Sequence, residues 1–395
     1  MTDHNNSTKI DPPQNRRALL KQGLGLGAAG LVASSPLWNQ LAMGADETLI
    51  PFSDMPPDYI APPVTPGAIH YLDSRGISSF YTPNADFYIV QHYNQPAVDV
   101  AGYKLRVTGL VNKPLELDMA MLRSRPKVEI DAGFECGGNS VRQFQGLIGN
   151  ARWTGTSLKG LLEAAGVKAE GIEVVFYGHD KGPEKIRDID VEQNFGRSLH
   201  INDAMNPDVL VVYEMNGEPL PLYHGAPLRL LVPGWYGVAN VKWLSQIHVQ
   251  DRRFMGRFMS RDYVTLSKQD IGGEIRWEER SVTRIRLKSA IVRVTRSGKS
   301  HTITGFVLND GTPLRTVEVS IDGGPWQAAT LDKKAGKYSW KLFTFVWDNA
   351  KAGEHTLVSR VIDSNGQVQT TPEQMPEKPT RWENYAQFPR KIVIT

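Results

Sequence analysis

The single cysteine of the 395-residue chain, Cys136, lies in the stretch FECGGNSVRQF. A lone cysteine excludes an intrachain disulfide, a Cys-x-x-Cys-His haem site and an iron–sulfur cluster held by cysteines of this chain alone. Taken alone, it reads as a buried structural thiol. However, the Gly-Gly-Asn turn lets the backbone approach a ligand closely, and a thiolate is a good soft ligand for a metal. With no second cysteine and no His-x-x-x-His pair nearby, zinc is not indicated.

Three basic residues form a second candidate site, in the stretch LYHGAPLRLLVPGWYGVANVKWL. His224, Arg229 and Lys242 are hydrogen-bond donors placed around an expected strand and a tight Pro-Gly-Trp-Tyr-Gly turn. Donors that converge in this way suit a polyanionic ligand. A structural histidine and a solvated arginine would also explain the residues, so ligand binding and a structural role both stay open.

Short strands and short helices must position these residues between about residues 86 and 282. The stretch YKLRVTGLV alternates apolar residues from Tyr103 to Val107, which predicts a half-buried strand. TSLKGLLEAAGV predicts a helix, with Thr156 as the N-cap and Gly166 as the C-cap. IEVVFYG, VLVVYEM and the start of LRLLVPGWYG are predicted as buried strands. The mixture indicates an α+β fold, without the regular alternation of a doubly wound sheet.

The pattern changes from about Ser289 onward. RTVEVSIDGGPWQAATL predicts two strands joined by a hairpin at Gly323-Gly324, and KYSWKLFTFVWD and HTLVSRVIDSNG continue the series of short strands. Several short strands separated by turns predict a β-sandwich of roughly immunoglobulin size.

The N-terminal segment resembles a twin-arginine export signal. It reads NRRALLKQGLGLGAAGLVASSPLW, with the pair Arg16-Arg17 before a weakly hydrophobic run. The run is too short and too rich in glycine for a stable membrane span. We therefore expect a periplasmic protein, exported after folding with a cofactor in place; an ordinary secretory signal is the alternative. The net charge of +3 and the lack of a Lys/Arg block argue against nucleic acid as a partner.

The block DVLVVYEMNGEPLPLYHGAPLRLLVPGWYGVANVKWLSQIHV resembles the sulfite oxidase family of molybdenum enzymes, and within it the bacterial periplasmic sulfite dehydrogenases. The resemblance extends over FECGGN, GNARWTGTSLKGLLEAAGV, FGRSLHINDAM and SRDY, and continues through EVSIDGGPW and RWENYAQFPRKI. It implies an export signal in residues 1–45, followed by two domains. Residues 46–284 would form an α+β molybdopterin-binding catalytic domain with a Pro-rich N-terminal arm. Residues 285–395 would form an immunoglobulin-like domain of the dimerisation type.

The resemblance also implies roles for individual residues. Cys136 would be the protein ligand to molybdenum, beside the dithiolene sulfurs of one molybdopterin; no haem is expected in this chain. Tyr263, in SRDY, would face the substrate oxygen, and Arg381 would supply an anion-binding arginine. The expected cofactor-binding residues are His92, His179, Asp180, His224, Arg229, Asn240, Val241 and Lys242.

Two positions depart from the family pattern near the expected substrate pocket. Val90 stands where many members have an arginine, and Val141 occupies the slot five residues after the cysteine where an arginine is common. Arg142 follows one residue later and is a candidate to replace the missing charge. These departures leave cofactor binding intact but leave the identity of the substrate open.

The resemblance implies oxidation of sulfite to sulfate by oxygen-atom transfer, with electrons passed to an external acceptor such as a c-type cytochrome. A homodimer or another homo-oligomer is also expected. One alternative is a related molybdenum enzyme that acts on sulfane sulfur or on an S- or N-oxide. Another is a cofactor-free binding protein with the same fold, against which the joint presence of Cys136, His224, Arg229, Lys242 and Tyr263 argues.

Overall fold

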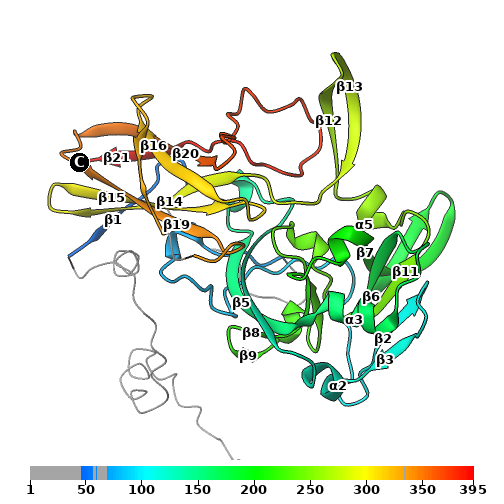
Figure 1. The fold of residues 1–395 in the computed structure, drawn as a ribbon. Coiled ribbons are helices and arrows are strands. Elements are labelled where there is room, and N and C mark those ends of the chain that lie inside the picture. Colours follow the sequence, from blue (N-terminus) through cyan, green and yellow to red (C-terminus); the bar gives the residue numbers. More distant parts are fainter. Residues whose placement is uncertain (1–45, 57–58, 60–68, 333–334) are drawn as a thin grey trace, which may run out of the picture. The chain divides into compact units, whose positions relative to one another are not determined.

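The computed structural model describes residues 46–56, 59, 69–332 and 335–395. The predicted export signal lies outside the described residues. Strands dominate the described part of the chain and its helices are short, so the structure is richer in strand than the expected α+β mixture (Figure 1). Within the same residues, no helix has the length and apolar character needed to cross a membrane.

Cys136 follows a strand of the first sheet directly. The strand order is β10-β8-β5-β4, β9 pairs with β8, and every pairing is antiparallel. The strands are β4 (Val128–Glu135), β5 (Ile148–Ser157), β8 (Leu210–Met215), β9 (Glu218–Pro219) and β10 (Arg229–Leu231). Cys136 thus directly follows one edge strand of this order, β4, and Arg229 is the first residue of the other edge strand, β10.

The second sheet has the order β3-β2-β11-β6-β7, with β2 and β11 parallel and the other pairs antiparallel. Its strands are β2 (Leu105–Gly109), β3 (Leu115–Leu117), β6 (Glu173–Ile186), β7 (Ile189–His200) and β11 (Leu244–Gln250). The predicted alternation is confirmed, because Tyr103, Leu105 and Val107 are all buried.

Short helices connect the strands. They are α2 (Met119–Arg123), α3 (Leu158–Ala165), α4 (Ile201–Ala204) and α5 (Arg257–Ser260), with the 3-10 turns η2 (Ser74–Gly76), η3 (Val141–Gln143), η4 (Leu222–His224) and η5 (Gly237–Ala239). Gly166 ends α3 with a φ of 68°, as predicted. The predicted N-cap, Thr156, is wrong by one residue: α3 begins at Leu158, so the extended Ser157 at the end of β5 is the cap, although its side chain makes no capping hydrogen bond.

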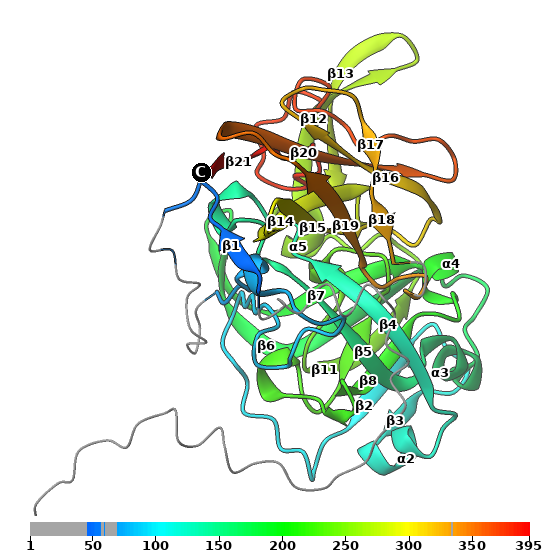
Figure 2. The same ribbon diagram turned by 90° about the vertical axis from the view of Figure 1, so that its left-hand side faces the viewer.

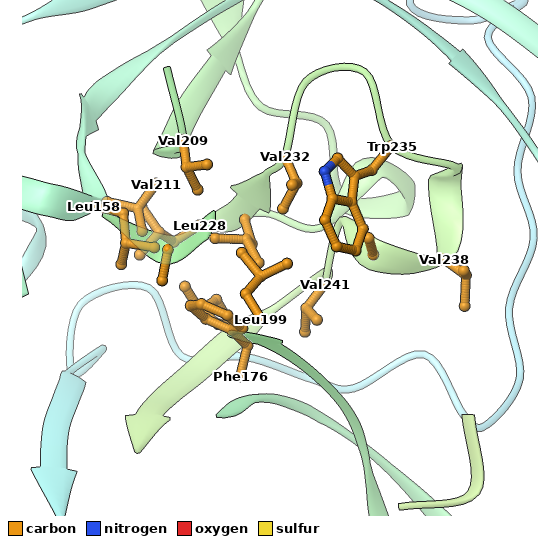
Figure 3. Close-up of a cluster of buried hydrophobic side chains, with 14 of the residues drawn as sticks. Leu158, Phe176, Leu199, Val209, Val211, Leu228, Val232, Trp235, Val238 and Val241 are labelled. Carbon is orange, nitrogen blue, oxygen red and sulfur yellow. The ribbon is translucent and has the colours of Figure 1, made fainter. Parts of the chain in front are cut away.

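The two sheets enclose a hydrophobic cluster, part of which Figure 3 shows. Phe176 of β6, Val211 of β8 and Leu228, beside β10, point toward one another there. Val241 lies in the same cluster (Figure 3). The loop that carries the predicted basic residues is therefore anchored on one side by a solid apolar core.

The C-terminal strands form two antiparallel sheets with the orders β1-β14-β15-β19-β18 and β17-β16-β20-β21. They are β1 (Thr48–Ile50), β14 (Lys288–Ser297), β15 (Ser300–Leu308), β16 (Leu314–Ile321), β17 (Gln327–Ala328), β18 (Thr330–Leu331), β19 (Lys341–Asp348), β20 (Gly353–Asp363) and β21 (Arg390–Ile394). One buried cluster takes side chains from both sheets, including Ile303 and Val361. The shared core agrees with the predicted sandwich; its immunoglobulin-like character stays a prediction.

The N-terminal arm joins these C-terminal sheets. Strand β1 pairs with β14, and Phe52 bridges to Ile392 of β21. Residues 48–52, which we placed with the catalytic domain, thus pack with the sandwich (Figure 2). The described residues belong to one compact unit, so the domain boundary at residue 284 stays a prediction.

A separate hairpin extends away from the sheets in both views (Figures 1 and 2). It consists of β12 (Val264–Ile271) and β13 (Glu274–Ser281), which pair along their whole length. Tyr263 immediately precedes β12, and the N–H of Val282 donates to the Tyr263 carbonyl at 2.8 Å. The base of the hairpin therefore fixes the backbone of a predicted site residue.

Candidate active site

One cavity brings together most of the predicted site residues. With the open space at its mouth, it holds about 620 Å³ of atom-free volume. The predicted residues that line it are His92, Cys136, Asp180, His224, Arg229, Asn240, Lys242 and Tyr263.

The Cys136 turn is held by its own hydrogen bonds. The Cys136 N–H donates to Leu147 O at 3.0 Å, and the Asn139 N–H donates to Cys136 O at 2.9 Å. The Asn139 side chain accepts from Leu147 N at 3.1 Å and donates to Glu135 Oε1 at 3.0 Å. A Cβ at Gly138 would lie 3.1 Å from the Trp382 ring, so glycine here makes room for that ring, and the close approach of a ligand stays a prediction.

The thiol of Cys136 is protonated at neutral pH in the absence of a cation. Burial raises its pKa to about 11, although hydrogen bonds from the Gly138 N–H and the Tyr263 hydroxyl act in the opposite direction. A bound metal cation would reverse this balance, because it stabilises the thiolate directly. The buried thiol is therefore poorly suited to act as a free nucleophile, and its role as a metal ligand stays a prediction.

Buried basic groups line another part of the cavity. Burial lowers the pKa of Lys242 to about 7, with Arg229 contributing in the same direction. Burial also lowers the pKa of Arg229 to about 10 and that of His224 to about 3. Clustered and desolvated cations disfavour their own protonated forms. An anionic ligand in the cavity would compensate these charges.

Asp180 is the acidic group of this cluster. Burial raises its pKa to about 7, although Lys242 opposes the shift. Its Oδ1 atom and the Nε atom of Arg229 are buried without a hydrogen-bond partner. Buried polar atoms are rarely left unpaired, so both atoms mark positions where a polar ligand would complete the site.

Arg229 and Asn240 also brace the loop around the cavity. Arg229 donates to His224 O at 2.9 Å and to Asn240 O at 3.1 Å. Asn240 Oδ1 accepts from Val232 N at 2.7 Å. Lys242 Nζ donates to Tyr223 O at 3.1 Å. These bonds fix the backbone of the basic segment before any ligand binds.

Aromatic rings form the wall near Tyr263. The His92 ring stacks on Phe258 with centroids 4.7 Å apart and lies 5.3 Å from the Tyr263 ring. Burial and Lys242 lower the pKa of His92 to about 4, so it is neutral at pH 7. Tyr263 stacks on Trp382 at 4.2 Å, and the guanidinium of Arg381 lies 4.6 Å from the Trp382 ring.

Arg381 is close enough to act on the site although it does not line the cavity. Its charge lowers the pKa of the Cys136 thiol and of His92. It comes from the segment between β20 and β21, which reaches the Cys136 turn: the Glu383 N–H donates to Gly137 O at 2.8 Å. Arg381, which the family resemblance suggested from a distant part of the sequence, therefore lies in a segment that contacts the Cys136 turn.

Besides Arg381, three predicted residues lie outside the cavity. His179 is exposed and approaches Tyr103, because neighbouring residues on β6 point to opposite faces and Asp180 takes the inner face. Val241 packs into the hydrophobic core and so contributes through its backbone, whose carbonyl accepts from Leu230 N at 2.8 Å. Arg142 is exposed on η3, so the structure does not bring it to the substrate side.

Sequence reasoning missed several residues of the site. Tyr88, Phe195 and Tyr223 line the cavity, and Trp382 packs against Tyr263 from outside it. Tyr88 lies a few residues before the predicted His92, and Phe195 is the first residue of the FGRSLH stretch, so both positions could have drawn attention. No pattern in the sequence predicts that Trp382 belongs to the site, because Trp382 and Tyr263 are more than a hundred residues apart along the chain.

Comparison with known proteins decides the family. The oxidoreductase molybdopterin-binding domain model matches residues 92–258. Sulfite oxidase from Arabidopsis thaliana is 32% identical over 334 residues, which cover 74% of this chain and 83% of that protein. Sulfite oxidase from Gallus gallus is 33% identical over 320 residues, covering 73% of this chain and 68% of that protein. The chain belongs to the sulfite oxidase family.

A solved structure extends the family likeness to the whole fold. The sulfane dehydrogenase SoxCD from Paracoccus pantotrophus has a chain that aligns with a TM-score of 0.71 and 22% identity. The alignment covers 97% of this chain and 100% of that chain. The C-terminal sheets are therefore part of a shared architecture, and not an addition peculiar to this protein.

The residues present fit the molybdopterin that the family implies. Within the part of the chain that the structure describes, Cys136 is the one sulfur that lines the cavity, as a metal already carrying two dithiolene sulfurs would need. The cations Arg229 and Lys242 match the negative phosphate group of molybdopterin. The Nε–H group of Arg229 has no hydrogen-bond acceptor in the protein and could donate to that ligand. The unpaired Asp180 Oδ1 matches the amino and ring N–H donors of a pterin ring.

Proposed function

We propose that this protein oxidises an inorganic sulfur compound with a molybdopterin cofactor, and that sulfite is the substrate, converted to sulfate. The observation that carries the proposal is the position of Cys136 in the same cavity as the buried cations Arg229 and Lys242. A soft ligand and a site for an anionic group thus face one enclosed space, an arrangement that suits a metal-bearing, phosphorylated cofactor.

The cofactor, when bound, would supply oxygen-atom transfer and storage of two electrons, and the residues of this chain would position it and the substrate. Cys136 would hold the metal through its sulfur. Tyr263 and Arg381 would act on the substrate side, since Tyr263 lines the cavity with Cys136 and Arg381 lies against Trp382, which stacks on Tyr263. A hydroxyl donor and a cation there would stabilise negative charge on the substrate oxygens.

A second candidate substrate is sulfane sulfur, favoured by one observation about charge. Val90 lines the cavity and Arg142 does not, so the substrate side has fewer cations than a small dianion would best use. The fold similarity to a sulfane dehydrogenase is consistent with this candidate.

Oxidation of sulfite releases two electrons and two protons as water supplies the added oxygen. We propose that the electrons pass to an external acceptor, with a c-type cytochrome as the candidate. We further propose periplasmic location through the twin-arginine segment at Arg16-Arg17, and assembly as a homo-oligomer.

The experiment that tests the proposed function compares substrates on one preparation. Molybdenum-loaded protein would be mixed with an artificial one-electron acceptor and with sulfite, thiosulfate or a protein-bound persulfide. Rapid reduction with sulfite alone supports the first candidate, whereas reduction only with the persulfide supports the second. No reduction with any sulfur donor, in protein with full metal content, would contradict both.

A further inference from the structure

We infer that Arg197 is a positioning residue that holds Tyr263 against the cavity, an inference that rests on the proposed role of Tyr263. Arg197 lies on β7 two residues after Phe195, which lines the cavity. Residues two apart on a strand leave it on the same face, so Arg197 extends toward the same side of the sheet. Only 1% of Arg197 is exposed.

Its guanidinium joins two segments that flank Tyr263. Nη1 donates to the carbonyl of Phe258 in α5, and Nη2 donates to the carbonyl of Val282 at 2.6 Å. Val282 in turn donates its N–H to Tyr263 O at 2.8 Å. The planar guanidinium of Arg197 thus holds α5, which precedes Tyr263, together with Val282, which follows β13 and bonds to Tyr263.

Tyr263 needs such support because its backbone is strained. Its φ of 56° lies in the left-handed region, which is unfavourable for a residue other than glycine. Strained residues persist only where surrounding contacts hold them. Tyr263 lines the cavity together with Cys136, and a Cβ at Gly137 would lie 3.4 Å from the Tyr263 ring, so a shift of this backbone would move the ring relative to the Cys136 turn.

The burial of Arg197 is costly, which argues that it does more than fill space. Among the residues that the structure describes, no carboxylate pairs with Arg197, and its Nε atom has no hydrogen-bond partner. Burial lowers its pKa to about 10, so the charge remains at neutral pH. An apolar side chain would avoid this desolvation cost but could not bind two carbonyls.

A matched control exists on β14. Arg293 is also buried, with 4% exposed, and donates to Ile77 O at 3.0 Å and to Arg75 O at 3.3 Å. It does not line the cavity. Arg293→Met therefore removes a buried arginine that binds backbone carbonyls, without touching the Tyr263 segment.

Hydrogen–deuterium exchange of the cofactor-free protein tests the positional claim directly. Exchange of the Val282 amide should be at least about tenfold faster in Arg197→Met, because the local opening that exposes it becomes easier. Arg197→Lys, which can still reach a carbonyl, should lie between Arg197→Met and wild type, and Arg293→Met should leave this amide unchanged. Unchanged exchange in Arg197→Met, or equal acceleration in Arg293→Met, would overturn the inference.

Steady-state kinetics of the molybdenum-loaded variants supply the second arm. Arg197→Met should lower kcat at least about tenfold with KM within about twofold, and Arg197→Lys should restore part of kcat. If exchange of the Val282 amide were faster in Arg197→Met but kcat were unchanged, Arg197 would have a structural role only, and its proposed role in positioning Tyr263 would be overturned. The exchange arm needs no substrate, so inactivity of the wild type with sulfite would count against the proposed function alone.

Discussion

Lys288 of β14 and Glu135, the residue directly before Cys136, form a buried ion pair. Lys288 Nζ lies 2.5 Å from Glu135 Oε1, and the two side chains are 0% and 2% exposed. The same carboxylate oxygen accepts from Asn139 Nδ2 at 3.0 Å, inside the Cys136 turn. The C-terminal sheet is therefore linked through one charge pair to the turn that carries the proposed metal ligand.

Breaking this pair from one side should destabilise the protein strongly. Lys288→Met leaves the Glu135 carboxylate buried without its cation, and the free energy of unfolding should fall by about 3–5 kcal/mol. Denaturant unfolding measures the change. The control is Lys391→Met, which removes a largely exposed pair with Glu354 and should cost less than about 1 kcal/mol. Equal losses in the free energy of unfolding from the two substitutions would show that the buried ion pair stabilises the protein no more than the exposed one.

Replacing the proposed metal ligand should separate folding from turnover. Cys136→Ser is nearly isosteric, so the variant should fold and keep most of its pterin. An oxygen ligand in place of the thiolate should abolish oxidation of the substrate. Pterin fluorescence after denaturation and a turnover assay measure the two properties. Full activity in Cys136→Ser would remove Cys136 from the metal site.

Lys242 should stabilise the loaded protein and destabilise the cofactor-free one. Without the cofactor, Lys242→Met removes a buried, poorly compensated charge and should raise the free energy of unfolding by about 1–3 kcal/mol at neutral pH. The same variant should lose most of its pterin. Lys341→Met, which alters a lysine outside the cavity, should leave pterin content unchanged. Loss of pterin in both variants would show a general effect of unfolding.

The stabilisation from Lys242→Met should depend on pH. Burial lowers the pKa of Lys242 in the folded protein to about 7, from an ordinary value of 10.5. Between these values the unfolded chain binds more protons, so the wild type becomes more stable as pH rises. The advantage of the variant should therefore be largest below pH 7 and fade toward pH 10.5. A pH-independent difference would contradict the assigned pKa.

The proposed role of Arg381 on the substrate side can be tested by steady-state kinetics. One charge-assisted hydrogen bond to an anion is worth about 1.5–3 kcal/mol, so Arg381→Ala should raise the sulfite KM about tenfold or more. Arg142→Ala is the matched control, because Arg142 is exposed away from the cavity, and it should leave KM unchanged. The reverse pattern would reassign the substrate arginine to Arg142.

Adding a charge to the cavity gives the converse prediction. Val90 lines the cavity, so the guanidinium of Val90→Arg should lower the sulfite KM, with a larger effect at low ionic strength. Kinetics at two salt concentrations measure the effect. If wild type oxidises sulfite poorly and Val90→Arg changes nothing, sulfane sulfur becomes the better candidate.

Local patterns in the sequence predicted the elements that depend on neighbouring residues. The alternation from Tyr103 to Val107 and the glycine at the end of α3 are confirmed, because strand burial and a helix C-cap are set within a few residues. Pairing of β1 with β14 was not predicted, since nothing local specifies a partner more than two hundred residues away. The long β12–β13 hairpin was also missed.

The residues of the candidate site show the same difference between local motifs and contacts that are distant along the chain. Residues in short motifs, such as His224 and Lys242, were found because the motif fixes their spacing, and the structure brings them to one cavity. His179 was included with Asp180 although a strand points the two side chains in opposite directions. Trp382 and Arg197 could not be assigned from sequence, because each acts through Tyr263, a residue distant along the chain.

The most direct test of the central claim is the stoichiometry of sulfite oxidation by molybdenum-loaded protein under anaerobic conditions. Ferricyanide reduction and sulfate formation would be measured together on the same sample. The account predicts two ferricyanide ions reduced for each sulfate formed, and loss of both products in Cys136→Ser. Fully loaded protein that reduces no ferricyanide and forms no sulfate would contradict sulfite oxidation by this enzyme.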